Sequence, residues 1–428
     1  MKSNLVVIFT YKYPYEPPTE QFLDMELQYL LKDDVDIIFI PVARMIDEDK
    51  TYKIIGEKRV SIHRIDRAPK LIEAGKALLH LPHFFIPLVK DIKNCLSRLD
   101  IKNIGQGIAY VFQDYLQAEV IYNNSNRIID QEVLSNYSSI TLYSYWLNAA
   151  AYSVAYLKKR ITLKTKSEVL AIARAHGDGD LYVEGMDCIR PGAQIIDKGL
   201  DCIYSISENG CEYLRHQMVN NVKVSRLGVE KSNSILVSRE NSDFIIVSCS
   251  VINENKRVQR IAEVLSKVEH SSLKWIHFGD GPLYDQLTEW CKNNMPSNIQ
   301  WCLNGYTEHA EIMQYFANFI PDLFINFSRV EGIPVSIMEA MSYSIPVLAT
   351  NAGAVSEIVK DGINGFVLPV DFLNDDATRL IEKVIAFNAK EKEMFRRAAY
   401  ETWNLEYNAE HNFSDFVNNI IGKRLNND

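Results

Sequence analysis

The sequence predicts an α/β protein with two Rossmann-like, doubly wound parallel-sheet domains that face each other across a cleft. Short apolar runs alternate with helix-forming segments, this alternation starts afresh after a polar stretch at residues 229–242, and 428 residues suffice for two or three domains. Apolar runs without polar alternation are typical of strands that are buried on both faces, as in parallel sheets. Ligands bind such sheets outside the carboxyl ends of the strands, so we expect the functional site in the cleft.

The N-terminal domain is expected to span residues 1–232. Apolar runs predict its strands at 5–9, 36–40, 138–146 and 168–176, and a helical pattern predicts a helix at 22–31. Residues 140–157 contain Ser, Asn and several Tyr, so a strand followed by a helix explains them better than a membrane span. The first strand is too short for the apolar part of a signal peptide, so we predict a cytoplasmic protein without a transmembrane segment.

The C-terminal domain is expected to span residues 242–400. Its helix after the first strand carries Val258, Ile261, Leu265 and Val268 on one stripe. A long last helix, about residues 390–421, is predicted to return to the first domain and complete it with residues 400–428. Strands are predicted at 244–249, 274–279, 298–302, 323–328, 345–350 and 365–368.

Composition and charge exclude several classes of protein. The seven cysteines form no C-x-x-C pair, which favours reduced thiols over a disulfide framework or a zinc site. The net charge of −9 lies in residues 241–428, with 16 basic and 25 acidic side chains, which argues against nucleic-acid binding. Residues 51–100 are locally basic, with 10 basic and 5 acidic side chains, which would suit an anionic surface or acceptor.

The segment at residues 69–99 is apolar with lysines between, and two interpretations remain open for it. It is either a set of core-packing helices broken at Pro82 and Pro87, or an interfacial face close to a lipid-linked acceptor.

The segment at residues 322–369 carries the chemistry. A buried strand ends at Asn326, and Pro334 is expected in the first turn of a helix, where no N–H donor is needed. A helix N-terminus offers free N–H groups and partial positive charge to a diphosphate, and Gly332 allows its close approach. From the residues alone, Glu331 and Glu339 are either a solvated loop acid and a helix-capping acid, or two carboxylates that flank this site. A carboxylate can accept two hydrogen bonds from sugar hydroxyls.

This segment resembles the E-x₇-E region of the family-4 retaining glycosyltransferases, which have the GT-B fold. The resemblance rests on E-G-I-P-V-S-I-M-E-A-M at 331–341, P-V-L-A-T-N-A-G at 346–353 and D-G-I-N-G-F-V-L at 361–368. Residues 173–182, 247–258 and 277–287 are similar to further segments of the family. Residues 13–30 resemble a subgroup that builds bacterial surface polysaccharides.

The resemblance implies a role for each matching residue. Glu339 would bind the ribose of the nucleotide and Glu331 the hydroxyls of the donor sugar. Lys256 would neutralise the leaving diphosphate, and His176 would contact the donor sugar at the cleft wall. Glu331, His176 and Lys256 are thus the implied catalytic residues. Further donor-binding residues are Arg257, Gly332, Ile333, Pro334, Val335, Ser336 and Gly281, and the acceptor-side residues are Thr19, Glu20 and Arg174.

The sequence departs from the family pattern at three places. Many members carry an arginine five or six residues before the lysine, where this chain has Val251 and Ser250, and Arg257 is the candidate to replace it. Ala354 stands where the family has a second glycine. The loop after the first strand has Thr19 and Glu20 in place of a glycine pair.

The implied activity is a retaining, metal-independent hexosyl transfer from a nucleotide diphosphate sugar to a glycan or lipid-linked saccharide. The setting would be capsule, O-antigen or exopolysaccharide synthesis, with peripheral contact at the inner face of a membrane and without cofactor or nucleic acid. We interpret Asp178 and Asp180, a D-x-D triplet, as a solvent loop and not a metal site. Two alternatives are a nucleotide-sugar epimerase of the same fold and a catalytically silent partner subunit.

Overall fold

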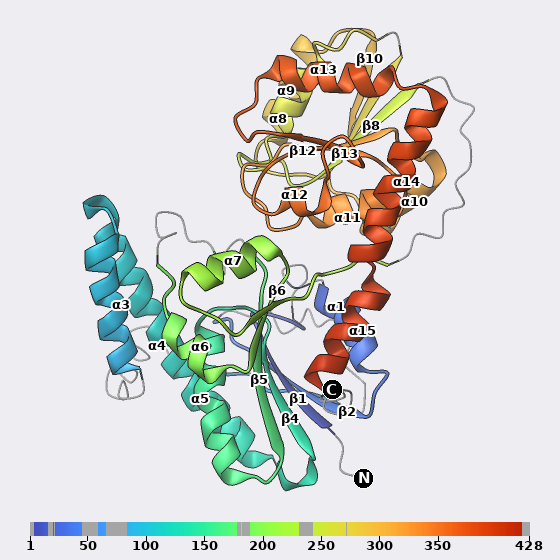
Figure 1. The fold of residues 1–428 in the computed structure, drawn as a ribbon. Coiled ribbons are helices and arrows are strands. Elements are labelled where there is room, and N and C mark those ends of the chain that lie inside the picture. Colours follow the sequence, from blue (N-terminus) through green and yellow to red (C-terminus); the bar gives the residue numbers. More distant parts are fainter. Residues whose placement is uncertain are drawn as a thin grey trace. The chain divides into compact units, whose positions relative to one another are not determined.

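The computed structural model describes residues 4–15, 20, 22–44, 59–65, 84–132, 134–177, 181, 189–230, 243–270 and 272–421. The chain forms two compact units (Figure 1): unit 1 contains residues 1–225 and 413–428, and unit 2 contains residues 226–412. We predicted domains of 1–232, with a return at about 400–428, and 242–400. In the structure the chain passes between the units at 225/226 and again at 412/413.

Unit 1 is built on a seven-stranded, fully parallel sheet in the order β3-β2-β1-β4-β5-β6-β7. The strands are β1 (Asn4–Thr10), β2 (Val35–Pro41), β3 (Val60–Ile62), β4 (Ser139–Ser144), β5 (Glu168–Ala175), β6 (Cys202–Ser205) and β7 (Val222–Val224). The four strands predicted for this half are present, whereas β3, β6 and β7 were not predicted.

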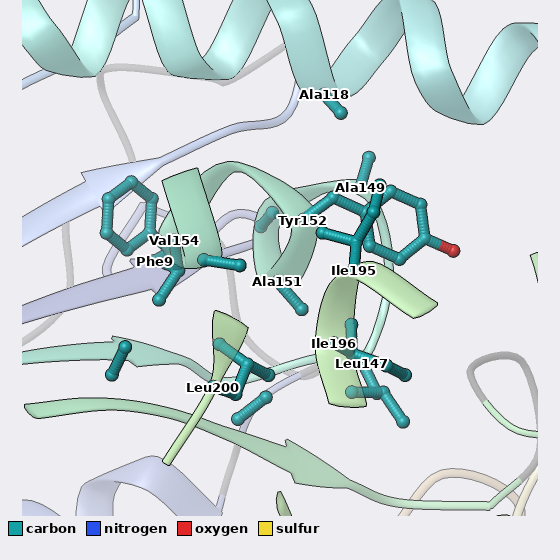
Figure 2. Close-up of a cluster of buried hydrophobic side chains, with 14 of the residues drawn as sticks. Phe9, Ala118, Leu147, Ala149, Ala151, Tyr152, Val154, Ile195, Ile196 and Leu200 are labelled. Carbon is teal, nitrogen blue, oxygen red and sulfur yellow. The ribbon is translucent and has the colours of Figure 1, made fainter. Parts of the chain in front are cut away.

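Helices cover both faces of this sheet. Helices α4 (Ile101–Gln131), α5 (Ala149–Lys164) and α6 (Ala193–Gly199) share one hydrophobic core with it, and Figure 2 shows Tyr152, Ile195 and Leu200 within that core. Helix α3 (Phe85–Arg98) packs on α4, and α7 (Glu208–His216) contacts β6 and β7. Helix α1 (Phe22–Leu30) and α15 (Ala409–Ile420) cover the opposite face. Residues 139–164 are the strand and helix predicted in place of a membrane span.

Two expectations about helices were wrong. Pro87 does not break α3, because it lies in the first turn, where its missing N–H costs no hydrogen bond, and Pro82 lies outside the described residues. The single helix predicted at 390–421 is two helices, α14 (Ala389–Glu406) and α15. Between them Tyr407 O accepts a hydrogen bond from Val229 N, and Ala409 N donates one to Val229 O. This backbone pairing with another segment replaces helical hydrogen bonds and ends α14.

Unit 2 has a six-stranded parallel sheet in the order β10-β9-β8-β11-β12-β13. All six predicted strands are found, as β8 (Phe244–Cys249), β9 (Leu273–Phe278), β10 (Ile299–Leu303), β11 (Leu323–Asn326), β12 (Val347–Thr350) and β13 (Gly365–Leu368). Helices α8 (Val258–Leu265), α9 (Tyr284–Asn294) and α13 (Asn374–Ile385) bury one face of this sheet. The other helices are α10 (His309–Phe319), α11 (Val335–Ser342), α12 (Val355–Ile358) and α14, which packs on α11.

Among the helices of the described ranges, none combines the length and the apolar character that crossing a bilayer requires.

Candidate active site

The strand orders place one topological switch point in each unit. In unit 2 the chain proceeds from β8 outward to β9 and β10, and then returns to lay β11 on the other side of β8. The loops that follow β8 and β11 therefore diverge at the same edge of the sheet and leave room for a ligand. Lys256 and Arg257 lie in the first of these loops, and Arg329 and Glu331 lie in the second.

Lys256 and Glu331 meet at this switch point. The Nζ of Lys256 lies 2.5 Å from Oε1 of Glu331, and both side chains are largely but not fully buried. Asn253 Oδ1 accepts a hydrogen bond from Lys256 N, and the Asn255 side chain bonds both the N–H and the carbonyl of Val330. Asn253 thus shapes the first loop and Asn255 joins it to the second, so the ammonium and the carboxylate face each other.

Helix α11 begins directly after Glu331. Pro334 is the N-cap, and the first intrahelical hydrogen bond runs from Ile337 N to Pro334 O, which leaves the N–H groups of Val335 and Ser336 ahead of it. Gly332, Val335 and Ser336 are half-buried, whereas Ile333 and Pro334 are buried. The turn therefore offers backbone N–H groups next to the Lys256–Glu331 pair, as an anion site requires.

Gly353 explains how this turn is held. Its φ is +58°, and a Cβ there would collide with the carbonyl oxygen of Glu331. Ala354 N also donates a hydrogen bond to Gly332 O. The loop after β12 thus packs backbone to backbone against residues 331–332, and alanine is compatible with position 354 but not with 353.

Glu339 points toward the same sheet edge from α11. Its Oε1 lies 2.7 Å from Nε2 of His309, and this hydrogen bond raises the pKa of His309 above its ordinary value. Burial raises the pKa of the Cys249 thiol to about 12, with a further upward contribution from Glu339 and a downward one from Lys256. Both charged groups are therefore within electrostatic reach of the end of β8.

Arg257 does not have the predicted role at a phosphate. Its guanidinium donates to Phe327 O, Ser328 O and Val370 O, and burial lowers its pKa to about 10. Arg257 thus fastens the loops after β11 and β13. Gly281 has a structural role as well, because a Cβ there would collide with the backbone of Ile252.

Unit 1 carries His176 at the end of β5, beside its own switch point between β1 and β4. Nε2 of His176 is 2.9 Å from Tyr145 O, and its ring lies 4.5 Å from that of Tyr145 and 4.7 Å from that of Trp146. Burial, aided by the charge of Arg174, lowers the pKa of His176 to about 3. The imidazole is therefore neutral at physiological pH and can act as a hydrogen-bonding group but not as a cation.

The acceptor-side roles of Glu20 and Arg174 need correction. The Glu20 carboxylate is buried and accepts hydrogen bonds from the backbone N–H groups of residues 11–13 and from Trp146 Nε1. Arg174 is 0% exposed, lies 2.9 Å from Glu26 and stacks on Phe416. Both groups hold elements of unit 1 together. Thr19, Asp178 and Asp180 lie outside the described residues.

Three residues at the unit 2 site were not predicted from the sequence. Arg329 is exposed in the loop after β11, and its charge helps to lower the pKa of Arg257. Ser328 Oγ is buried, with no hydrogen-bond partner among the described residues, and His309 is the partner of Glu339. Ser328 and Arg329 lie two and three residues after the end of β11, a position that the sequence shows. His309 is thirty positions from Glu339 and gives no such signal.

Within the described ranges, no group of three or more His, Cys, Asp or Glu side chains is arranged to hold a metal ion.

Two parallel-sheet Rossmann-like units in one chain define the GT-B class of fold. The chain superposes on the apo form of a lipopolysaccharide outer core galactosyltransferase, WaaB, with a TM-score of 0.68 over 98% of this chain and 99% of that one, at 14% identity. Residues 232–402 match the family described as glycosyl transferases group 1.

Curated relatives give the same indication for part of the chain. An uncharacterized glycosyltransferase of Methanocaldococcus jannaschii is 26% identical over 226 residues, which are 52% of this chain and 60% of that protein. The amylovoran biosynthesis glycosyltransferase AmsK of Erwinia amylovora is 25% identical over 157 residues, 35% of this chain and 38% of its own length. The chain thus spans 60% or less of the length of these relatives.

Proposed function

We propose that this chain is a glycosyltransferase that transfers a sugar from a nucleotide diphosphate sugar to a glycan or lipid-linked saccharide in surface polysaccharide synthesis. The observation that carries the proposal is the meeting of Lys256, Glu331 and the start of α11 at the switch point of unit 2. The family match over this unit and the similarity to AmsK support it. We also propose a cytoplasmic location for the reaction.

The geometry suggests how these residues act on a donor. The α11 N-terminus and Lys256 bind the diphosphate, and Lys256 stabilises the charge that develops on it as the sugar leaves. Glu331, which now pairs with Lys256, then becomes free to accept hydrogen bonds from donor-sugar hydroxyls. Glu339 would give up its hydrogen bond to His309 and accept hydrogen bonds from the ribose hydroxyls instead. The α11 N-terminus and Lys256 would thus stabilise the leaving diphosphate without a metal ion.

Retention of the anomeric configuration is the finer part of this proposal. Same-face attack would leave the departing phosphate to accept the proton of the acceptor hydroxyl. The neutral state of His176 fits a hydrogen-bonding role better than it fits proton transfer.

A thermal-stability screen with a panel of nucleotide sugars tests the proposal. A donor at about one hundred times its Kd stabilises the folded protein by about 2.7 kcal/mol, which raises the Tm by several degrees. The variant Glu331→Gln should reduce this shift and abolish transfer, whereas Glu289→Gln, an exposed glutamate on α9, should retain both.

Three outcomes would count against the proposal: no nucleotide sugar raises the Tm, Glu331→Gln transfers as the parent does, or the donor is converted without any acceptor. The last outcome would indicate an epimerase.

A further inference from the structure

Helix α3 of unit 1 has two apolar stripes. Leu88 and Cys95 form the first, which is buried against the core of unit 1. The second consists of Phe85, Ile86, Val89 and Leu96, spaced at helical intervals of three, four and seven residues and all exposed, Ile86 by 79%. A helix with one packed stripe needs no second apolar stripe in water, so this surface requires a further explanation.

The exposed stripe borders a hollow between α3, α5 and α6. This cavity has a volume of about 590 Å³, and its wall includes Ile86, Tyr156, Leu163 and Ile195. Leu163, near the end of α5, is 83% exposed. The hollow is thus an apolar surface built from three helices of unit 1, and we call it, together with the exposed stripe of α3, the α3 face.

Basic side chains surround the apolar part of the α3 face. Lys159 and Lys198 line the hollow itself, Lys93 lies between Val89 and Leu96 along α3, and Lys90 and Arg98 line a second cavity of about 340 Å³ next to it. The two cavities share Pro87, Gln194 and Lys198. Ammonium groups around an apolar hollow are complementary to a ligand that joins negative charge to hydrocarbon.

Several acidic groups of the same region have partners within the protein. Asp201 pairs with Lys158, and Asp130 pairs with Arg160 and Lys164. Asp91 is buried, where it accepts hydrogen bonds from Tyr115 Oη and Gly192 N, and Asp197 accepts one from Asn220 N. Among the described residues, Lys159 and Lys198 line the hollow and no acidic side chain does, so its rim has a positive potential.

We propose that the α3 face binds the surface of a bilayer that contains anionic phospholipid. The apolar side chains would enter the boundary between headgroups and acyl chains, and the lysines would contact lipid phosphates. A second copy of the chain is a poorer occupant, because a symmetric contact would set the same lysines against each other. Under the proposed function, the α3 face would bring the enzyme to a lipid-linked acceptor. Binding of the α3 face to a membrane can be measured without donor or acceptor, so its test is independent of the proposed function.

Co-sedimentation of the full chain with lipid vesicles tests the proposal. Vesicles of phosphatidylcholine with about one third phosphatidylglycerol should bind the protein, pure phosphatidylcholine should bind it weakly, and raising the salt from about 0.1 to about 0.5 M should release it. The double variants Lys93→Glu/Lys159→Glu and Ile86→Asp/Leu163→Asp should each lower the partition coefficient about tenfold or more.

The matched control is Leu405→Asp on α14 of unit 2, where Leu405 is 76% exposed. It should bind vesicles like the parent. All variants should keep the parent Tm, which separates loss of binding from loss of folding, and nucleotide-sugar stabilisation measured in parallel reports on the proposed function independently.

The proposal is overturned if the parent protein ignores anionic vesicles or binds neutral ones equally well. It is also overturned if the double variants bind like the parent, or if they change only the oligomeric state, which would identify a second copy of the chain as the occupant.

Discussion

The two units share a parallel-sheet architecture with one switch point each, yet their charged residues are used differently. At the unit 1 switch point, Glu20 is saturated by four donors within the unit, and the nearby Arg174 is sealed in an ion pair with Glu26. At that of unit 2, Lys256, Glu331 and Glu339 form pairs that are still partly accessible. Topology thus indicates where a ligand can bind, whereas the state of the charged groups shows which ones are free to bind it.

The largest effect is expected on the free energy of unfolding, for a substitution at the buried ion pair of unit 1. It tests whether the charged groups at the unit 1 switch point serve the fold. Arg174→Ala removes the partner of a buried carboxylate, and breaking such a pair costs about 3–5 kcal/mol. Glu26 is 1% exposed, and burial already raises its pKa, so the unpaired carboxylate would be strongly disfavoured. Denaturant unfolding would measure the loss. Arg215→Ala, an exposed arginine on α7, should change stability by no more than about 0.5 kcal/mol.

If Arg174→Ala kept the parent stability but lost only the use of an acceptor, Arg174 would not be needed to hold unit 1 together. The acceptor-side role implied by the family resemblance would then stand.

The next effect is expected on activity, in unit 2. Lys256→Met should lower kcat/KM about 100-fold or more, because it removes a charge placed at the developing negative charge of the diphosphate. Its effect on the free energy of unfolding should be smaller than that of Arg174→Ala, since the lysine side chain is 23% exposed. Lys292→Met on α9 is the matched control and should have near-parent kinetics. If Lys256→Met and Arg174→Ala lowered the free energy of unfolding equally, the charged groups at both switch points would serve the fold, and the distinction between them would be wrong.

The smallest effect concerns the His309–Glu339 pair. Because the hydrogen bond to Glu339 raises the pKa of His309, the ion pair is fully present below pH 6.5 and is lost as the pH rises through the raised folded-state value. A ribose that needs Glu339 competes with this pair. Nucleotide affinity should therefore rise between pH 6 and 8, by at most about fivefold, because an exposed pair contributes at most about 1 kcal/mol.

Calorimetric titration of nucleotide into the parent and into His309→Gln would measure this dependence. The variant should bind equally at both pH values. A pH dependence that persists in His309→Gln would show that another group is responsible.

Much of the unit 2 site was predictable from local sequence. Three features can be predicted from short segments alone. They are a buried strand that ends at Asn326, a glycine and a proline ahead of an apolar helix, and a lysine after the first strand of unit 2. Parallel strands place their carboxyl ends at one edge, so these segments had to converge. The residue-level roles of Glu331, Glu339 and Lys256 nevertheless remain proposals.

The sequence by itself determined the strands with long apolar runs and the helices with clear periodicity, because strand and helix patterns are local. Only the tertiary structure decided that Glu20, Arg174 and Arg257 serve the fold, that the last helix is interrupted at Tyr407, and that α3 leaves an apolar stripe exposed. In each case the outcome depends on a partner distant in sequence, such as Trp146 for Glu20 or Val229 for Tyr407. A charged side chain looks the same in sequence whether its partner is a buried group or a ligand.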